Sequence, residues 1–140
     1  MKDLFVDTNI VIDLLAKREP FYKEAQELFS LADTNADIRL YVSTLTFANA
    51  HYLLLKQYKL EDTQKILSKF KVLVKVLPFD DKILELALIS DFKDFEDSIQ
   101  YHSALIHNMD VIITRNEKDL KLSKLGVMNA KQYVNQCAEK

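Results

Sequence analysis

The chain has 140 residues, of which 49% are hydrophobic and 29% are charged, a balance typical of a folded globular protein and not of a disordered one. This length predicts one domain spanning residues 1–140. The net charge of -2 excludes bulk positive charge as the means of binding nucleic acid, so any such contact must be local. The single glycine, Gly126, argues against phosphate loops and dinucleotide-binding turns, which need several glycines.

The sequence also bears on where the protein works. The single cysteine, Cys137, cannot form an intramolecular disulfide, and Asp3 and Asp7 stand where a signal peptide would need an apolar core. No uninterrupted apolar run approaches the roughly 18 residues of a membrane span. We therefore expect a cytoplasmic protein without a membrane partner.

The chain opens with a short strand and a short helix. Residues 4–6 form an apolar run that stops at Asp7, and Thr8 or Asn9 can cap the helix that follows. Pro20 suits the first turn of a second helix, in which apolar residues recur at helical spacing as far as residue 32. These patterns predict a strand, a carboxylate and then two helices.

A second strand and a helical hairpin are predicted next. The strand occupies residues 38–42, and Ser43 or Thr44 caps the helix after it. Asp62 opens another helix, which we expect to pack against the previous one. Alternating apolar residues at 72–77 predict a third strand.

The second half of the chain continues the alternation. Asp80 or Asp81 begins a helix, and a loop at residues 92–96 leads to the next one. The elements predicted here are helices at 80–89 and 97–107, strands at 111–114 and 127–129, and a last helix containing Tyr133 and Val134.

Strands separated by helical crossovers favour a mainly parallel sheet with helices on both faces. We therefore predict an α/β fold, a three-layer α/β/α sandwich without an internal repeat or linker. In such sheets ligands bind beyond the carboxyl ends of the strands.

Polar residues follow two of the predicted strands at that position. Asp7 comes directly after the first strand, and Asn116 and Asp119 come after the strand at residues 111–114. Because the carboxyl ends of parallel strands meet at one edge of the sheet, we expect these three side chains to converge there.

A second acidic group opens the helix before that strand. Asp97, with Asp94 and Glu96 beside it, can face the same crevice. Carboxylates gathered in one crevice repel each other unless cations hold them, and hard oxygen ligands suit Mg²⁺ or Mn²⁺. Such a metal activates water and neutralises charge in phosphodiester hydrolysis, so no side-chain nucleophile is needed.

Four segments resemble, in order and spacing, the acidic motifs of the PIN-domain superfamily, the fold of VapC-type toxins. They are VDTNIVID, SxLTFANA, DFEDSIQYHSAL and IITRNEKDL. The resemblance runs from Lys2 to about Val134. It implies a five-stranded parallel sheet, Mg²⁺- or Mn²⁺-dependent cleavage of RNA, and often toxin activity that a cognate antitoxin protein restrains. Homodimers are common in this family, although no segment here specifies an interface.

The resemblance assigns roles to the acidic residues by position. Asp7 is the first acid and a metal ligand, and Asp97 corresponds to the third acid and shares that metal. Asp94 and Glu96 are further candidate ligands. Asp94 and Asp97 also have the spacing of a capping box, which explains them without catalysis.

The fourth acidic motif leaves a choice between Asn116 and Asp119, of which we favour Asp119 for its charge. By analogy with the family, the hydroxyls of Thr8 and Thr114 position Asp7 and water. These residues also fit an ordinary turn or polar loop, and their joint placement is what favours the catalytic reading.

The second motif departs from the family. Many PIN domains have a glutamate where this chain has Asn49, whose carbonyl can take a metal or orient its water but brings no charge. Glu96 is the neighbour that would compensate. The alternative reading is a catalytically weak or inactive PIN-like module that binds RNA or protein.

Two further interpretations concern charge and chemistry. Arg115, Lys118 and Lys121 lie beside the predicted site and are candidate RNA contacts, whereas lysines on the helix surfaces are more simply solvated. A phosphohydrolase of the haloacid-dehalogenase type would use an aspartate after a first strand, but it expects a second aspartate at the position of Asn9.

Overall fold

The computed structural model describes residues 1–120 and 123–138, with every side chain among them except that of Asp119. The side chain of Asp119 and the whole of Lys121 thus lie outside the described residues. The described chain folds around a five-stranded, all-parallel sheet. Its strands are β1 (Lys2–Val6), β2 (Ile38–Ser43), β3 (Lys75–Leu77), β4 (Val111–Ile113) and β5 (Gly126–Met128).

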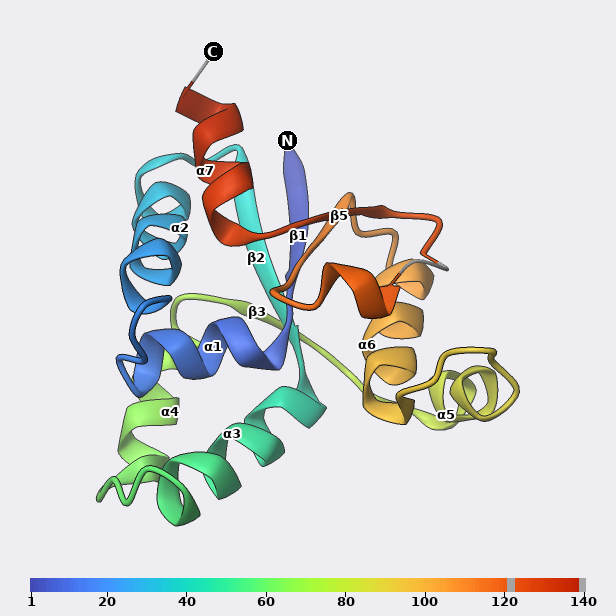
Figure 1. Cartoon of the computed structure of the whole chain (residues 1–140), viewed down its shortest axis with the longest axis horizontal. Helices are drawn as coiled ribbons and strands as arrows, with labels where there is room; N and C mark the ends of the chain where they lie inside the picture. The colour runs from blue at the N-terminus through green and yellow to red at the C-terminus, as the bar shows by residue number, and fades with distance from the viewer. Residues whose placement is uncertain (121–122, 139–140) are drawn as a thin grey trace.

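Helices cover both faces of the sheet (Figure 1). They are α1 (Thr8–Leu15), α2 (Tyr22–Thr34), α3 (Thr44–Lys56), α4 (Thr63–Lys71), α5 (Asp81–Leu88), α6 (Phe95–Ile106) and α7 (Ala130–Ala138), with the short 3-10 helix η1 (Glu117–Leu120) after β4. In Figure 1, α1, α2 and α7 lie on one side of the sheet, and α6 lies on the other with α5 packed against it.

Alternate residues of the central strand enter two different cores, as the period of two in a strand requires. Leu4 and Val6 pack with Ile10 of α1 and Leu28 of α2, and all four are buried. Phe5 is also fully buried but belongs to the core beneath α6. The predicted three-layer α/β/α sandwich is therefore confirmed.

The strand order β3-β2-β1-β4-β5 places the first strand in the middle of the sheet. The chain builds outward from β1 through β2 to β3, and then crosses back to add β4 and β5 on the other side of β1. Open parallel sheets bind ligands where the order reverses in this way, outside the carboxyl ends of the two strands. Here that point lies between β1 and β4, where Val6 pairs with Ile113.

Two helix starts differ from, or refine, the predictions. The N-cap of α1 is Asp7, not Thr8 or Asn9, because helical backbone begins at Thr8, whose hydroxyl contacts Thr46 instead of its own helix. Helix α6 begins at Phe95, inside the predicted loop, because Asp94 caps it.

The third strand is shorter than predicted, at Lys75–Leu77. The amides of Val72, Leu73 and Val74 bond to carbonyls of the last turn of α4, which removes these residues from the sheet. Val72 is consequently 84% exposed. The prediction of a strand over 72–77 was therefore correct for its second half only, because residues 72–74 close helix α4.

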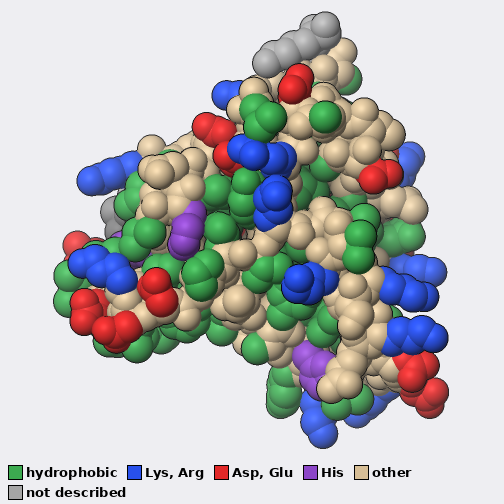
Figure 2. All heavy atoms as spheres, turned by 180° about the vertical axis from the view of Figure 1, so that it is seen from behind, with side chains coloured by type: hydrophobic (Ala, Val, Ile, Leu, Met, Phe, Trp, Pro, Cys, Tyr) green, Lys and Arg blue, Asp and Glu red, His purple; other side chains and the backbone are tan. Residues whose placement is uncertain are grey.

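The predicted hairpin of α3 and α4 is present, and its core includes Leu54 and Leu67. Lys65, Lys69 and Lys71 of α4 are exposed, and Figure 2 shows basic side chains lying among acidic and polar ones on the far face of the molecule. Among the described residues, no helix combines the length and apolar character that crossing a bilayer requires.

Candidate active site

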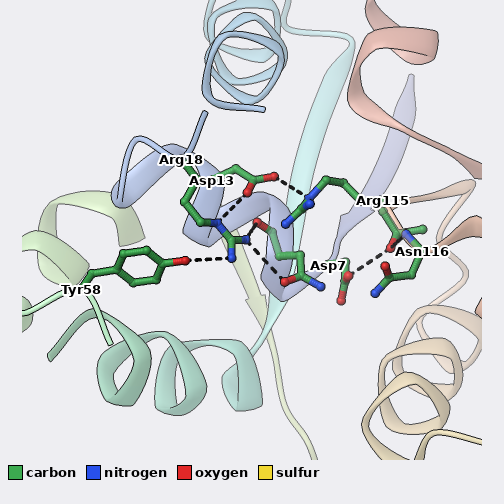
Figure 3. Close-up of polar contacts among 8 residues, drawn as sticks. Asp7, Asp13, Arg18, Tyr58, Arg115 and Asn116 are labelled. Atoms are coloured by element: carbon green, nitrogen blue, oxygen red, sulfur yellow. Dashed lines mark hydrogen bonds and ion pairs between the residues drawn. The ribbon is translucent and has the colours of Figure 1, made fainter. Parts of the chain in front are cut away.

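Asp7 lies at the end of β1, at the point where the strand order reverses. It occupies the N-cap position of α1 with extended backbone, yet its side chain makes no capping bond to the helix. Instead Oδ2 accepts a hydrogen bond of 3.0 Å from Oγ1 of Thr114, which also accepts one from the amide of Asn116. Figure 3 shows Asp7 and Asn116 close to each other, with the hydrogen bond of Asp7 drawn as a dashed line. The structure thus brings Asp7, Thr114 and Asn116 together.

Asp7 as a residue is only 7% exposed. Burial raises its pKa, the hydrogen bonds from Thr114 and from the backbone of Thr8 lower it, and the negative charge of Glu96 raises it. The opposing lowering by the cation of Arg115 is the smallest effect. Asp7 is therefore a buried acid with too little positive charge around it, which is the environment that a bound cation would relieve.

The first turn of α6 supplies the second group of candidate residues. The carboxylate of Asp94 caps the helix by accepting a 2.9 Å hydrogen bond from the amide of Asp97, as its spacing predicted. Oε1 of Glu96 accepts a 2.7 Å hydrogen bond from the amide nitrogen of Asn49 on α3. Asn49 and Glu96 thus form one polar pair, which connects the second and third motifs.

A buried polar cluster lies under this turn. Nε2 of Gln100 donates to the hydroxyls of Thr8 and Thr46, each at 3.0 Å, and the two hydroxyls are 2.9 Å apart. Since Gln100 is one helical turn beyond Asp97, the face of α6 that bears both residues is turned toward the start of α1. Asp97 is half-buried on that face.

Sequence reasoning missed Gln100 and Thr46 as members of the site. Gln100 stands between the apolar residues Ile99 and Tyr101, and it follows Asp97 by three positions. That spacing was the available signal.

The donors at this crevice suit a hard divalent cation. No three His, Cys, Asp or Glu side chains lie close enough together to enclose a metal, within the side chains that the structure describes. Mg²⁺ commonly keeps several waters and binds through one or two carboxylates, so a complete protein cage is not required. The buried carboxylate of Asp7 and its oxygen-bearing neighbours fit such an ion in chemistry.

The predicted RNA contacts differ in their surroundings. Lys118 is exposed. Arg115 is only 26% exposed at its side chain, because its Nε lies 2.9 Å from the carboxylate of Asp13 and its guanidinium stacks 3.9 Å above the ring of Phe21. The sequence analysis did not predict a role for Asp13. The available signal was a single carboxylate within the otherwise mainly apolar helix α1.

Comparison with known families settles which fold family this architecture represents. A family model described as a PIN domain matches residues 3–118. The chain belongs to the PIN-domain family. The resemblance read from the four motifs is confirmed, and the family assignment favours a PIN domain over a phosphohydrolase of the haloacid-dehalogenase type. No curated protein was found to match the sequence.

Solved structures with similar PIN-like folds include several toxin proteins. A toxin-antitoxin complex from Klebsiella pneumoniae shares 24% identity, with a TM-score of 0.67 over 91% of this chain and 97% of that one. DNA-bound VapBC from Salmonella typhimurium shares 17% identity, with a TM-score of 0.69 over 93% and 99%. VapC20 from Mycobacterium tuberculosis, described as a sarcin-ricin loop cleaving toxin, shares 14%, with a TM-score of 0.67 over 84% and 95%. At these identities the likeness establishes the fold of this PIN domain.

Proposed function

We propose that this PIN domain is a metal-dependent endoribonuclease that hydrolyses RNA phosphodiester bonds. The observation that supports this most is Asp7, a buried acid of raised pKa at the switch point of the sheet, with the negative charge of Glu96 acting on it. A divalent cation, Mg²⁺ or Mn²⁺, supplies Lewis-acid and charge-neutralising chemistry toward a phosphate.

In this proposal the acidic residues hold the ion and the neutral ones orient them. Asp7 and Asp97 are the principal ligands, with Asp119 as the third acid and Glu96 and Asp94 as nearby carboxylates. Thr114 fixes the rotamer of Asp7 through its hydrogen bond.

The neutral residues have supporting roles. Thr8 holds the start of α6 against α1 through Gln100, and Asn116 fixes the hydroxyl of Thr114 through its amide. Asn49 orients Glu96, whose carboxylate replaces the charge that the second motif lacks.

We further propose that the chain is the toxin of a toxin-antitoxin pair. Similar structures are described as a toxin-antitoxin complex and as a toxin that cleaves the sarcin-ricin loop. The partners proposed are therefore an RNA substrate, a cognate antitoxin protein and a second copy of the chain in a homodimer. We propose that the protein acts in the cytoplasm, where it has access to RNA.

The decisive experiment is cleavage of a mixed RNA pool in Mg²⁺ or Mn²⁺. We expect wild type to cleave, and we expect Asp7→Asn, Asp97→Asn and EDTA-treated wild type to lose at least about 100-fold in rate, as loss of a metal ligand implies. Asp110→Asn is the matched control, because it removes one carboxylate at the opposite end of the sheet, where Asp110 caps the amide of Asp3.

A second candidate function is a PIN-like module that binds RNA or protein with little or no cleavage. The observation that favours it is the neutral amide of Asn49, which pairs with Glu96 at 2.7 Å. If purified wild type binds the RNA pool and the metal without cleaving, and Asn49→Glu then gains cleavage, this second function replaces the first. Equal cleavage by wild type and Asp7→Asn would instead indicate a contaminating nuclease.

A further inference from the structure

Asp13 joins two arginines that come from distant parts of the chain (Figure 3). Its side chain is fully buried, with Oδ1 2.8 Å from Nε of Arg18 and Oδ2 2.9 Å from Nε of Arg115. Arg18 follows α1, whereas Arg115 follows β4 and stands between Thr114 and Asn116. One carboxylate is thus shared by two cations, which leaves this cluster with a net positive charge beside the acidic crevice.

The two arginines are used differently. The terminal nitrogens of Arg18 are occupied within the protein, because Nη1 donates to the hydroxyl of Tyr58 at 3.1 Å and Nη2 donates to the carbonyl of Asn9 at 2.8 Å. Within the described residues, Arg115 is held by Asp13 at Nε and by the ring of Phe21. Its Nη1 and Nη2 have no hydrogen-bond partner among the residues that the structure describes, and its side chain is partly exposed.

Arg115 is also close to the proposed reaction site. Thr114, the residue before it, donates a hydrogen bond from its hydroxyl to Asp7. The backbone amide of Asn116, the residue after it, donates to that hydroxyl. The positive charge of Arg115 is one of the effects that lower the pKa of Asp7. The guanidinium is therefore fixed within electrostatic range of Asp7, and its two terminal nitrogens have no partner within the described part of the chain.

Stability alone does not explain this arrangement. Burying a carboxylate and partly burying two arginine side chains costs desolvation energy that their attraction only partly repays. Fixing a guanidinium in advance, however, lowers the entropy lost when it binds an anion. A planar fork of N–H donors matches the oxygens of a phosphate.

We infer that Arg115 binds a backbone phosphate of the nucleic acid substrate at the Asp7 crevice, and that Asp13 is the positioning residue that presents it. Arg18 neutralises the second oxygen of Asp13, and Phe21 supports the plane of the guanidinium. This inference rests on the proposed function in one respect, namely that the phosphate belongs to RNA.

The test is the affinity of a labelled single-stranded RNA, measured by fluorescence anisotropy at several salt concentrations in an Asp7→Asn background that prevents cleavage. Arg115→Gln should weaken binding on the order of ten-fold and reduce the salt slope by about 0.7, the value for one lost phosphate contact on a single strand. Arg39→Gln is the matched control, because Arg39 is ion-paired with Asp3 at 2.7 Å. It should leave the salt slope within about 0.2 of the parent.

Asp13→Asn separates positioning from bulk charge by the sign of its effect. It removes a negative charge near the crevice, so a purely electrostatic attraction would tighten RNA binding. Release of Arg115 from its fixed position would weaken binding instead, and weakening is the result that we expect. Phe21→Leu changes no charge and should weaken binding as well, which keeps the test valid if Asp13→Asn does not fold.

These outcomes are independent of the cleavage assay. Unchanged affinity and salt slope in Arg115→Gln, or tighter binding in a folded Asp13→Asn variant, would overturn the inference even if wild type cleaves RNA. Weaker binding in Arg115→Gln, Asp13→Asn and Phe21→Leu would support it even if wild type proves unable to cleave. In a cleaving enzyme, Arg115→Gln should raise KM more than it lowers kcat, because the phosphate contact is made in the bound ground state.

Discussion

Asp7 combines two properties that a residue seldom has for structural reasons. It stands at a helix N-cap without a side-chain capping bond, and it is an acid that burial makes harder to ionise. An aspartate that only ended the strand would gain more by capping α1. The hydroxyl of Thr114 instead donates to its carboxylate and aligns it with the loop after β4. The residue thus gives up local stability to place a carboxylate at the switch point.

This cost yields a prediction for the metal-free protein. Because the pKa of Asp7 is raised above its ordinary value of 3.8, the folded state holds this proton more tightly than the unfolded state. The protonated carboxyl of Asp7 therefore contributes its whole stabilising effect below pH 3.8, and this contribution is lost as the pH rises through the pKa of the folded state. Asp7→Asn should have a larger free energy of unfolding than wild type at about pH 7, with the difference shrinking as the pH falls.

Urea denaturation in EDTA at a series of pH values measures this difference. Asp110→Asn serves as the comparison, because Asp110 is exposed and its substitution relieves no burial. A less stable Asp7→Asn at neutral pH would show that the carboxylate stabilises the empty fold, contrary to the argument from burial.

At the scale of elements, the first turn of α6 contains both a stabilising N-cap and candidate site residues. Asp94 caps this helix, and the turn that it fixes presents Glu96 and Asp97. On the next turn Gln100 ties the helix to α1 and α3 through two threonine hydroxyls. The position of the second acidic group is consequently set by a cap and by a buried polar cluster.

The cap can be tested against a matched cap elsewhere. Asp94→Ala should cost about 1 kcal/mol of stability, the usual value for an N-cap, and should also weaken Mn²⁺ binding by loosening the turn that holds Glu96 and Asp97. Asp80→Ala removes the equivalent cap of α5, where Oδ1 accepts a hydrogen bond from the amide of Ile83 at 3.1 Å. It should cost about as much stability but leave Mn²⁺ binding unchanged.

Chemical denaturation gives the stability of both variants, and calorimetric titration with Mn²⁺ gives their affinities. Asp94→Ser should restore most of the stability, because a serine hydroxyl also caps. Equal metal affinity in Asp94→Ala and Asp80→Ala would show that the α6 cap has no part in the site.

At the scale of the whole molecule, the crevice joins segments that are far apart in the chain. The N-terminal strand, the start of α3, the first turns of α6 and the loop after β4 all meet there. An ion bound at their junction would add a further link to the hydrogen bonds that already join these segments. Metal binding should therefore stabilise the protein against global unfolding.

Thermal denaturation tests this coupling. Mn²⁺ at about 100 times its Kd should add roughly 2.7 kcal/mol to the free energy of unfolding of wild type, by mass action on the native state. Asp7→Asn should show little of this gain, whereas Asp110→Asn should retain it. A gain of equal size in Asp7→Asn would place the ion elsewhere on the molecule.

The sequence by itself determined the features that depend on neighbours along the chain. The alternation of strands and helices, Asp7 at a strand end and the cap at Asp94 follow from local periodicity and capping chemistry. The sequence placed two further caps at Ser43 or Thr44 and at Asp80 or Asp81, and the structure selects Ser43 and Asp80. The third strand was predicted too long because an apolar run can end a helix as well as form a strand. The contacts of Asp7 with Thr114, of Gln100 with Thr8 and Thr46, and of Asp13 with Arg115 were decided only by tertiary structure. They depend on which strands become neighbours in the sheet, and that choice is made by burying the apolar faces of the whole chain together, which no local pattern records.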